Sequence, residues 1–124
     1  MKRKSVGYFK GTDSTLLTNL VLSGYDTVPI SNGIDKHGMS VTRIDNQNRH
    51  ALLIGYLHKI TAQDDDDVQT QDIFHICRTY GIPLILEVPA ALQEAGARLI
   101  PNAPREVELL DPADTLRRAL EILA

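Results

Sequence analysis

The sequence predicts a three-layer α/β domain built on a mostly parallel sheet. Three apolar runs rich in β-forming residues, Val6–Lys10, Ala51–Leu57 and Ile82–Leu86, each end in polar or glycine-bearing residues, and a helix-like stretch usually follows. This alternation is typical of parallel sheets covered by helices. Because such sheets bind ligands beyond the carboxyl ends of their strands, the alternation also predicts where a site should lie.

The length of the chain predicts a single domain spanning residues 1–124. Hydrophobic residues make up 43% of the sequence, which is near the globular norm and argues against wholesale disorder. A chain of this size buries roughly two-thirds of its unfolded surface on folding. That is enough for one sheet with helices packed on it, without help from disulfides.

Charge and cysteine content indicate the class of protein. The net charge of -3 offers no electrostatic reason to expect a nucleic-acid partner. The single cysteine, Cys77, cannot form an internal disulfide, which favours a reducing compartment. No apolar run reaches the roughly 18 residues of a membrane span, and Ser5–Lys10 is too short for the core of a signal peptide. We therefore expect a soluble cytoplasmic protein with no membrane partner.

The first part of the chain predicts a strand, a helix and a second strand. Ser5–Lys10 forms the strand, and Thr12–Leu22 carries leucines at helical spacing. Gly24 is the expected end of the helix. Tyr25–Ile30 is the next strand, where Pro29 removes one ladder donor and favours either an edge strand or a strand about to leave the sheet.

The middle of the chain predicts a β-hairpin inserted into the α/β pattern. Met39–Asp45 has strand character, Asn46–Asn48 forms a turn, and Ala51–Ile60 is the strongest strand in the sequence. The continuous apolar character of Ala51–Leu57 indicates burial on both faces, hence a central strand.

The remainder of the chain alternates helices and strands. In order, the predicted elements are a helix over Val68–Tyr80 ended by Gly81, a strand over Ile82–Val88, a short helix from Pro89 to Ala95 closed by Gly96, strands over Ala97–Ile100 and Arg105–Leu110, and a last helix capped by Asp111. With about five parallel strands, this order is Rossmann-like or flavodoxin-like, an architecture that hosts many unrelated functions.

The turn after the first strand is a candidate anion site. Free amides and hydroxyls at Gly11, Thr12, Asp13 and Ser14 are suited to a phosphate or carboxylate at a helix start. However, neither the three-glycine dinucleotide pattern nor the phosphate-loop lysine pattern occurs, and Asp13 would repel an anion. The commoner role of such residues is a plain N-cap.

The loop after the second strand, Ser31–Gly38, is the densest polar segment. Asn32, Asp35 and His37 offer hydrogen bonds, a charge and a titrating group, and the glycines would let the loop close over a ligand. An ordinary solvated loop explains the same composition.

Two further candidates stand at strand ends. His58 follows the central strand and could act as acid, base or anion contact, or simply bond a backbone carbonyl. Glu87 ends the Ile82–Leu86 strand and could bond a ribose or act as a base, or be an exposed strand terminus.

No metal site is indicated, and the cofactor is unknown from the sequence. The tract Asp64–Asp67 lacks the alternate spacing of calcium ligands and is typical of a solvated linker. No histidine pair shares zinc-ligand spacing with a cysteine. Cys77 falls on the apolar face of its helix and is predicted to be a packed thiol.

Three functions remain open. The first, which we prefer, is a small-molecule-binding module that holds a phosphate- or carboxylate-bearing metabolite between the Gly11 turn, the Ser31–Gly38 loop and His58, as an accessory or sensor subunit. The second is a small enzyme using His58 or His37 as acid–base catalyst, oriented by Asp13 or Glu87, although no recognisable catalytic constellation occurs. The third is a structural subunit; a homodimer or larger assembly is expected in any case, because edge strands need protection.

Overall fold

The computed structural model describes residues 4–9, 11–31, 39–40, 50–57, 70–101 and 103–124. Within them six strands form one sheet in the order β3-β2-β1-β4-β5-β6, and every pair of neighbours is parallel. The strands are β1 (Ser5–Tyr8), β2 (Asp26–Ser31), β3 (Met39–Ser40), β4 (Leu52–Tyr56), β5 (Leu84–Glu87) and β6 (Val107–Leu110). The α/β class predicted from the sequence is confirmed, and the strand order is that of a Rossmann-like doubly wound sheet.

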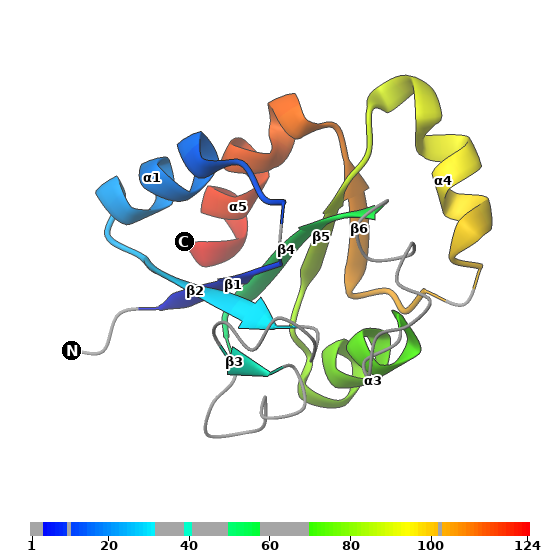
Figure 1. Ribbon diagram of the computed structural model, residues 1–124, viewed down its shortest axis with the longest axis horizontal. Coiled ribbons are helices and arrows are strands. Elements are labelled where there is room, and N and C mark those ends of the chain that lie inside the picture. Colours follow the sequence, from blue (N-terminus) through cyan, green and yellow to red (C-terminus); the bar gives the residue numbers. More distant parts are fainter. Residues whose placement is uncertain (1–3, 10, 32–38, 41–49, 58–69, 102) are drawn as a thin grey trace.

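Helices cover both faces of the sheet. They are α1 (Ser14–Leu22), α3 (Thr70–Tyr80), α4 (Gln93–Leu99) and α5 (Thr115–Leu123), with the short 3-10 turns η2 (Ala90–Leu92) and η3 (Pro112–Asp114). Figure 1 shows α1 and α5 side by side on one face and α3 on the other. None of the described helices is long and apolar enough to cross a bilayer.

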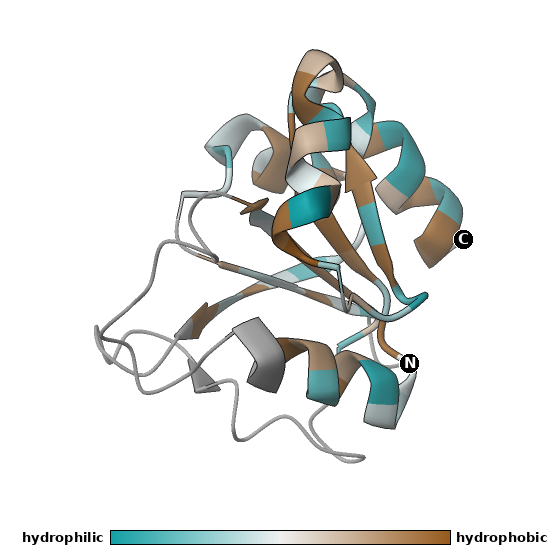
Figure 2. Ribbon diagram, turned by 90° about the vertical axis from the view of Figure 1, so that its right-hand side faces the viewer, coloured by the Kyte–Doolittle hydropathy of each residue, from teal (hydrophilic) through white to brown (hydrophobic). Residues whose placement is uncertain are grey.

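Two apolar cores lie on opposite faces of the sheet. Under α1 and α5 the buried side chains are Val6, Leu16, Leu20, Leu52, Ile54, Ile85, Ala119 and Leu123. Under α3 they include Phe9, Leu53, Leu57, Phe74, Cys77, Leu84 and Leu86. Figure 2 shows the strands as largely hydrophobic ribbons between helices with polar outer turns.

The strand β4 contributes to both cores, since Leu52 and Ile54 face α1 and α5 while Leu53 faces α3. It is flanked by β1 on one side and by β5 on the other. The prediction that Ala51–Leu57 supplies the central strand is therefore confirmed.

The predicted hairpin is not confirmed. Met39–Ser40 pairs in parallel with β2 at one edge of the sheet, and β2 and β1 lie between it and β4. Both edges of β4 are already occupied by β1 and β5. A two-residue hairpin joins antiparallel strands only, whereas this sheet is parallel throughout its described pairs. Residues 41–49 lie outside the described part of the chain.

The segment from Pro89 to Ile100 differs from the prediction. The helical segment expected after Pro89 is present as η2 and α4, but its expected end at Gly96 and the expected strand Ala97–Ile100 are wrong, because α4 runs through Gly96 to Leu99. Gly96 does not end this helix. It lies where a Cβ atom would meet Cδ2 of Leu57 at 2.9 Å, so it allows the helix to approach the end of β4. Gly24 and Gly81, by contrast, follow α1 and α3 at φ 98° and 64°, as helix-ending glycines do.

The topology selects one edge of the sheet for function. The chain leaves β1 through α1 toward β2, but leaves β4 through α3 toward β5, on the other side. The connections therefore diverge between the carboxyl ends of β1 and β4. In open parallel sheets, ligands commonly bind at such a divergence. The larger cavity in the described part of the chain lies beside it, at the carboxyl end of β4 on the side of β5 rather than of β1.

Candidate functional site

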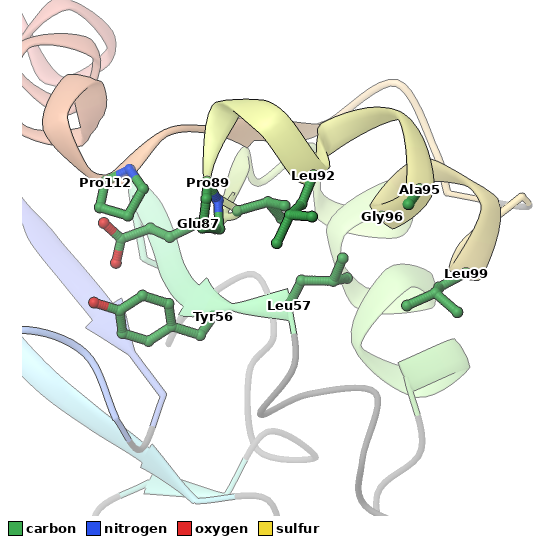
Figure 3. Close-up of a pocket in the computed structure, with 10 residues that line it drawn as sticks. Tyr56, Leu57, Glu87, Pro89, Leu92, Ala95, Gly96, Leu99 and Pro112 are labelled. Atoms are coloured by element: carbon green, nitrogen blue, oxygen red, sulfur yellow. The ribbon is translucent and has the colours of Figure 1, made fainter.

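A cavity of about 720 Å³ lies between the carboxyl ends of β4 and β5 and the helix α4 (Figure 3). This volume is within the range of about 300–1,000 Å³ typical of small-molecule sites. The lining residues are Tyr56, Leu57, Glu87, Val88, Pro89, Leu92, Ala95, Gly96, Leu99 and Pro112. All except Tyr56 and Glu87 are apolar or glycine, so the cavity has an apolar wall and one polar end.

Local sequence explains how the apolar wall forms. Pro89 follows β5 and lacks a backbone N–H, so the strand ladder does not extend beyond it and the chain turns into η2. Gly96 then brings α4 close to Leu57. On the same helical segment, Leu92 and Leu99 line the cavity while remaining 56% and 65% exposed. The apolar wall is therefore partly open to solvent.

The polar end is formed by Glu87 and Tyr56, which are register partners on neighbouring strands. In Figure 3 the carboxyl group and the phenol hydroxyl point to the same side, below Pro112. The hydroxyl of Thr115 donates a hydrogen bond of 2.7 Å to Oε2 of Glu87. Glu87 is only 3% exposed, yet its Oε1 is buried without a hydrogen-bond partner.

Burial and neighbouring charges raise the proton affinity of this end of the cavity. Burial raises the pKa of Glu87; the hydrogen bond from Thr115 opposes this rise, and the charges of Asp13 and Asp111 add to it. The pKa of Tyr56 is raised by burial, and further by Glu87 and Asp13. The described lining residues include no lysine, arginine or histidine. The electrostatic environment is therefore negative.

Asp111 is held in its charged form by the backbone. Its Oδ1 accepts from the amide of Ala113 at 2.9 Å, and its Oδ2 accepts from the amide of Ala90 at 2.9 Å. These bonds lower the pKa of Asp111. The same carboxylate caps η3, as the sequence predicted, and ties it to the segment that follows β5.

The turn after β1 has the geometry of a helix cap. Asp13 accepts a hydrogen bond of 3.2 Å from the amide of Thr15, and the hydroxyl of Thr12 donates to the carbonyl of Phe9 at 2.7 Å. Gly11 adopts φ 96°. Ser14 lines a second cavity of about 300 Å³, beside α1 and β2. None of these four candidates lines the larger cavity, although the charge of Asp13 acts on Glu87 and Tyr56.

Four other candidate site residues, Asn32, Asp35, His37 and His58, lie outside the described residues, as does the Asp64–Asp67 tract. Their convergence on one ligand stays a prediction. Of the candidates that the structure describes, Glu87 alone lines the larger cavity. It is buried rather than an exposed strand terminus.

Two other reactive side chains lie away from this site. His50 is buried at the amino end of β4, where its Nδ1 lies 2.7 Å from the hydroxyl of Ser5, and burial lowers its pKa. Cys77 is fully buried on α3, and burial raises its pKa to about 12. The prediction of a packed, unreactive thiol agrees with this placement.

The sequence analysis missed most of the cavity wall, including Tyr56 and Leu57, and also missed Thr115, which contacts Glu87. The available signal was a pair of leucines in one short helical segment, Leu92 of η2 and Leu99 of α4, which the structure leaves exposed. The hydrogen bond between Thr115 and Glu87 could not be predicted from the sequence, because 28 positions separate the two residues.

Neither models of protein families nor curated proteins match this sequence. The functional argument therefore depends on the chemistry of the cavity.

Proposed function

We propose that this protein is a small-molecule-binding module whose ligand occupies the cavity between β4, β5 and α4. The observation that supports the proposal is an apolar cavity of about 720 Å³ that ends at a buried carboxyl group with one unpartnered oxygen. A domain that holds a ligand in this way suits an accessory or sensor subunit.

The apolar wall provides the main source of affinity. Removal of apolar surface from water contributes about 25 cal/mol per Å², and a ligand in the cavity would cover both Leu92 and Leu99, which are exposed. The polar end then orients the ligand, because a few polar groups in an apolar site restrict how a molecule lies in it.

The charge of the ligand is a separate question. The phosphate- or carboxylate-bearing metabolite expected from the sequence would bind between the Gly11 turn, the Ser31–Gly38 loop and His58, and of these residues 32–38 and His58 lie outside the described part of the chain. The described carboxyl groups around the polar end are those of Asp13, Glu87 and Asp111. These carboxyl groups favour a ligand whose head group is positively charged.

Filling the cavity tests the proposal. Ala95 lines the cavity and is exposed, so Ala95→Phe should occupy the space without disturbing the core. Ala97→Phe is the matched control, because Ala97 is exposed on the same helix but does not line the cavity. The probe is the neutral molecule 4-phenyl-1-butanol, and binding is measured by ligand-observed NMR.

We expect Ala95→Phe to weaken probe binding by about tenfold or more, equivalent to about 1.4 kcal/mol, and Ala97→Phe to leave it unchanged. Equal binding by wild type and Ala95→Phe would place the ligand elsewhere. Absence of probe binding at millimolar concentration would remove the basis for a binding module.

A second candidate, a small acid–base enzyme, is favoured by the environment of Glu87. Buried carboxyl groups with raised pKa near a cavity are often general acids or bases at neutral pH. This candidate differs from the enzyme expected from the sequence, because Glu87 itself carries the proton in place of His58 or His37. It requires that Glu87→Gln retain ligand binding but abolish turnover.

A further inference from the structure

We infer that the cavity takes an organic cation, with an apolar body along the Leu57–Leu92–Leu99 wall and an ammonium-type head beside Glu87. The inference rests on the proposed function, because it names the chemical class of ligand for the same cavity. Four observations carry it: an incompletely satisfied carboxyl group, the sign of the surrounding charge, the access to the carboxyl group and the shape of the wall.

The first observation is that the Glu87 carboxyl group lacks one partner. Thr115 satisfies Oε2 through its hydroxyl, but Oε1 has no hydrogen-bond partner although the residue is 3% exposed. Buried polar oxygens in folded proteins are nearly always paired. The carboxyl group at the polar end of the cavity is therefore incompletely paired, and a positive charge placed nearby would stabilise its ionised form.

The second observation is the sign of the charge around this oxygen. Asp111 is kept ionised by two backbone amides, and Asp13 caps α1 with its carboxylate. Both charges act on Glu87. No cationic side chain is present among the described residues that line the cavity. A positive head is attracted by the carboxylates of Asp13 and Asp111 and favours the ionised form of Glu87, whereas a negative head is repelled by these charges.

The third observation concerns access. Oε1 is covered in the empty cavity, but direct contact is not required, because opposite charges interact strongly within about 4–6 Å. Tyr56 stands beside Glu87 in Figure 3 and is only half-buried. Its aromatic ring offers a second favourable surface for a cation. An ammonium head next to Tyr56 would therefore interact with both groups.

The fourth observation is the shape of the wall. In Figure 3 the lining side chains extend in a row from Glu87 and Tyr56 at one end to Ala95 and Leu99 at the other. The polar groups are confined to one end of that row. An elongated amphipathic amine matches this distribution, because its charge and its apolar body are separated in the same way.

Three probes with one body and different heads test the inference: 4-phenylbutylamine, 4-phenyl-1-butanol and 4-phenylbutyrate. At pH 7 and low salt, calorimetry should show the amine binding at least tenfold more tightly than the alcohol, and the carboxylate binding least tightly. In Glu87→Gln the advantage of the amine should disappear, while binding of the alcohol changes less than threefold. Circular dichroism establishes that the variant is folded.

Glu94→Gln is the matched control. Like Glu87→Gln, it removes one negative charge, but the charge comes from α4. Glu94 is 87% exposed, pairs with Arg98 at 3.1 Å and does not line the cavity. The amine should keep its advantage in this variant. If Glu87→Gln fails to fold, NMR of the ¹³C-labelled wild type tests the inference instead. The side-chain carboxyl resonance of Glu87 should shift when the amine is added and should not shift when the alcohol is added.

The outcomes separate the two proposals. A carboxylate that binds as tightly as the amine, an amine advantage that survives Glu87→Gln, or an unmoved Glu87 resonance would overturn the cation inference. If the alcohol still binds in those cases, the proposed function stands. Failure of all three probes to bind at millimolar concentration would overturn both.

Discussion

Thr115, the first residue of α5, donates a hydrogen bond of 2.7 Å from its hydroxyl to Oε2 of Glu87, the last residue of β5. Both side chains are buried. The bond fixes one carboxyl oxygen and leaves the other without a partner. The position of the cavity's acidic group thus depends on a helix that packs on the face opposite α3.

Replacing Thr115 by valine should therefore destabilise the fold. The change keeps the side-chain shape but removes the donor, so Oε2 of Glu87 would lose its only hydrogen bond from a described side chain. Loss of one partner from a buried polar group costs about 1–3 kcal/mol. Urea unfolding at pH 7 measures the difference. Thr79→Val, at an exposed position on α3, is the control and should stay within about 0.5 kcal/mol of wild type.

Glu87 should make stability fall as pH rises. Its folded pKa is raised above the usual 4.5 by burial and by the charges of Asp13 and Asp111, against the opposing bond from Thr115. The folded protein therefore binds this proton more tightly than the unfolded chain does. The resulting stabilisation is complete below 4.5 and is lost as pH rises through the folded pKa.

The Glu87→Gln variant isolates this effect, because glutamine does not titrate. Urea unfolding of both proteins between pH 4 and pH 8 should show wild type losing stability relative to the variant as pH increases. A difference that is constant with pH, or that runs in the other direction, would show that burial does not govern this carboxyl group.

His50 should have the opposite effect at acidic pH. Burial lowers its folded pKa below the usual 6.5, so the unfolded chain binds the proton more tightly. Its contribution to stability is complete above 6.5 and is lost as pH falls through that value. Thermal unfolding between pH 5 and pH 8 should show this loss in wild type and less of it in His50→Gln. His75→Gln, at an exposed position on α3, should behave as wild type.

Gly7→Ala should crowd the centre of the sheet. A Cβ atom there would lie 2.6 Å from Cδ2 of Leu53, 2.9 Å from Cγ1 of Ile30 and 3.1 Å from Cδ2 of His50. Overpacking of this kind costs about 1–3 kcal/mol. Urea unfolding measures the cost, and the Leu53→Val background should reduce it by removing the nearest contact. An unchanged cost in that background would contradict the mechanism.

The homodimer or larger assembly expected from the sequence remains a prediction. The sheet ends in β3 on one side and β6 on the other, and unpaired strand edges need protection. Light scattering should give at least twice the monomer mass at about 50 μM, a concentration at which even micromolar dimers form. A monomer mass there would contradict this expectation.

The sequence predicted the fold class because alternation of apolar strands and amphipathic helices is a local property. The central position of β4 followed from its uninterrupted apolar run, which needs neighbours on both faces. The sequence did not predict which strand pairs with Met39–Ser40, because so short a strand does not specify its pairing. Gly96 was misinterpreted as a helix end because its close neighbour, Leu57, is distant in the chain.

The sequence predicted only that a site would lie at the carboxyl edge of the sheet. Glu87 was placed there because it ends a strand, and the structure brings it to a cavity. Whether a strand-end carboxyl group is exposed or buried depends on side chains from later elements, here Thr115 and Pro112. Such contacts leave no pattern in the spacing of residues, so the environment of Glu87 could not be derived from the sequence.

The two bonds of Asp111 also have a dynamic consequence. One carboxylate holds the amide of Ala90, which begins η2, and the amide of Ala113, within η3. These segments flank the mouth of the cavity through Pro89 and Pro112. Because both amides depend on a single acceptor, release of that carboxylate frees the two segments together. We therefore expect the amide protons of Ala90 and Ala113 to exchange with solvent together.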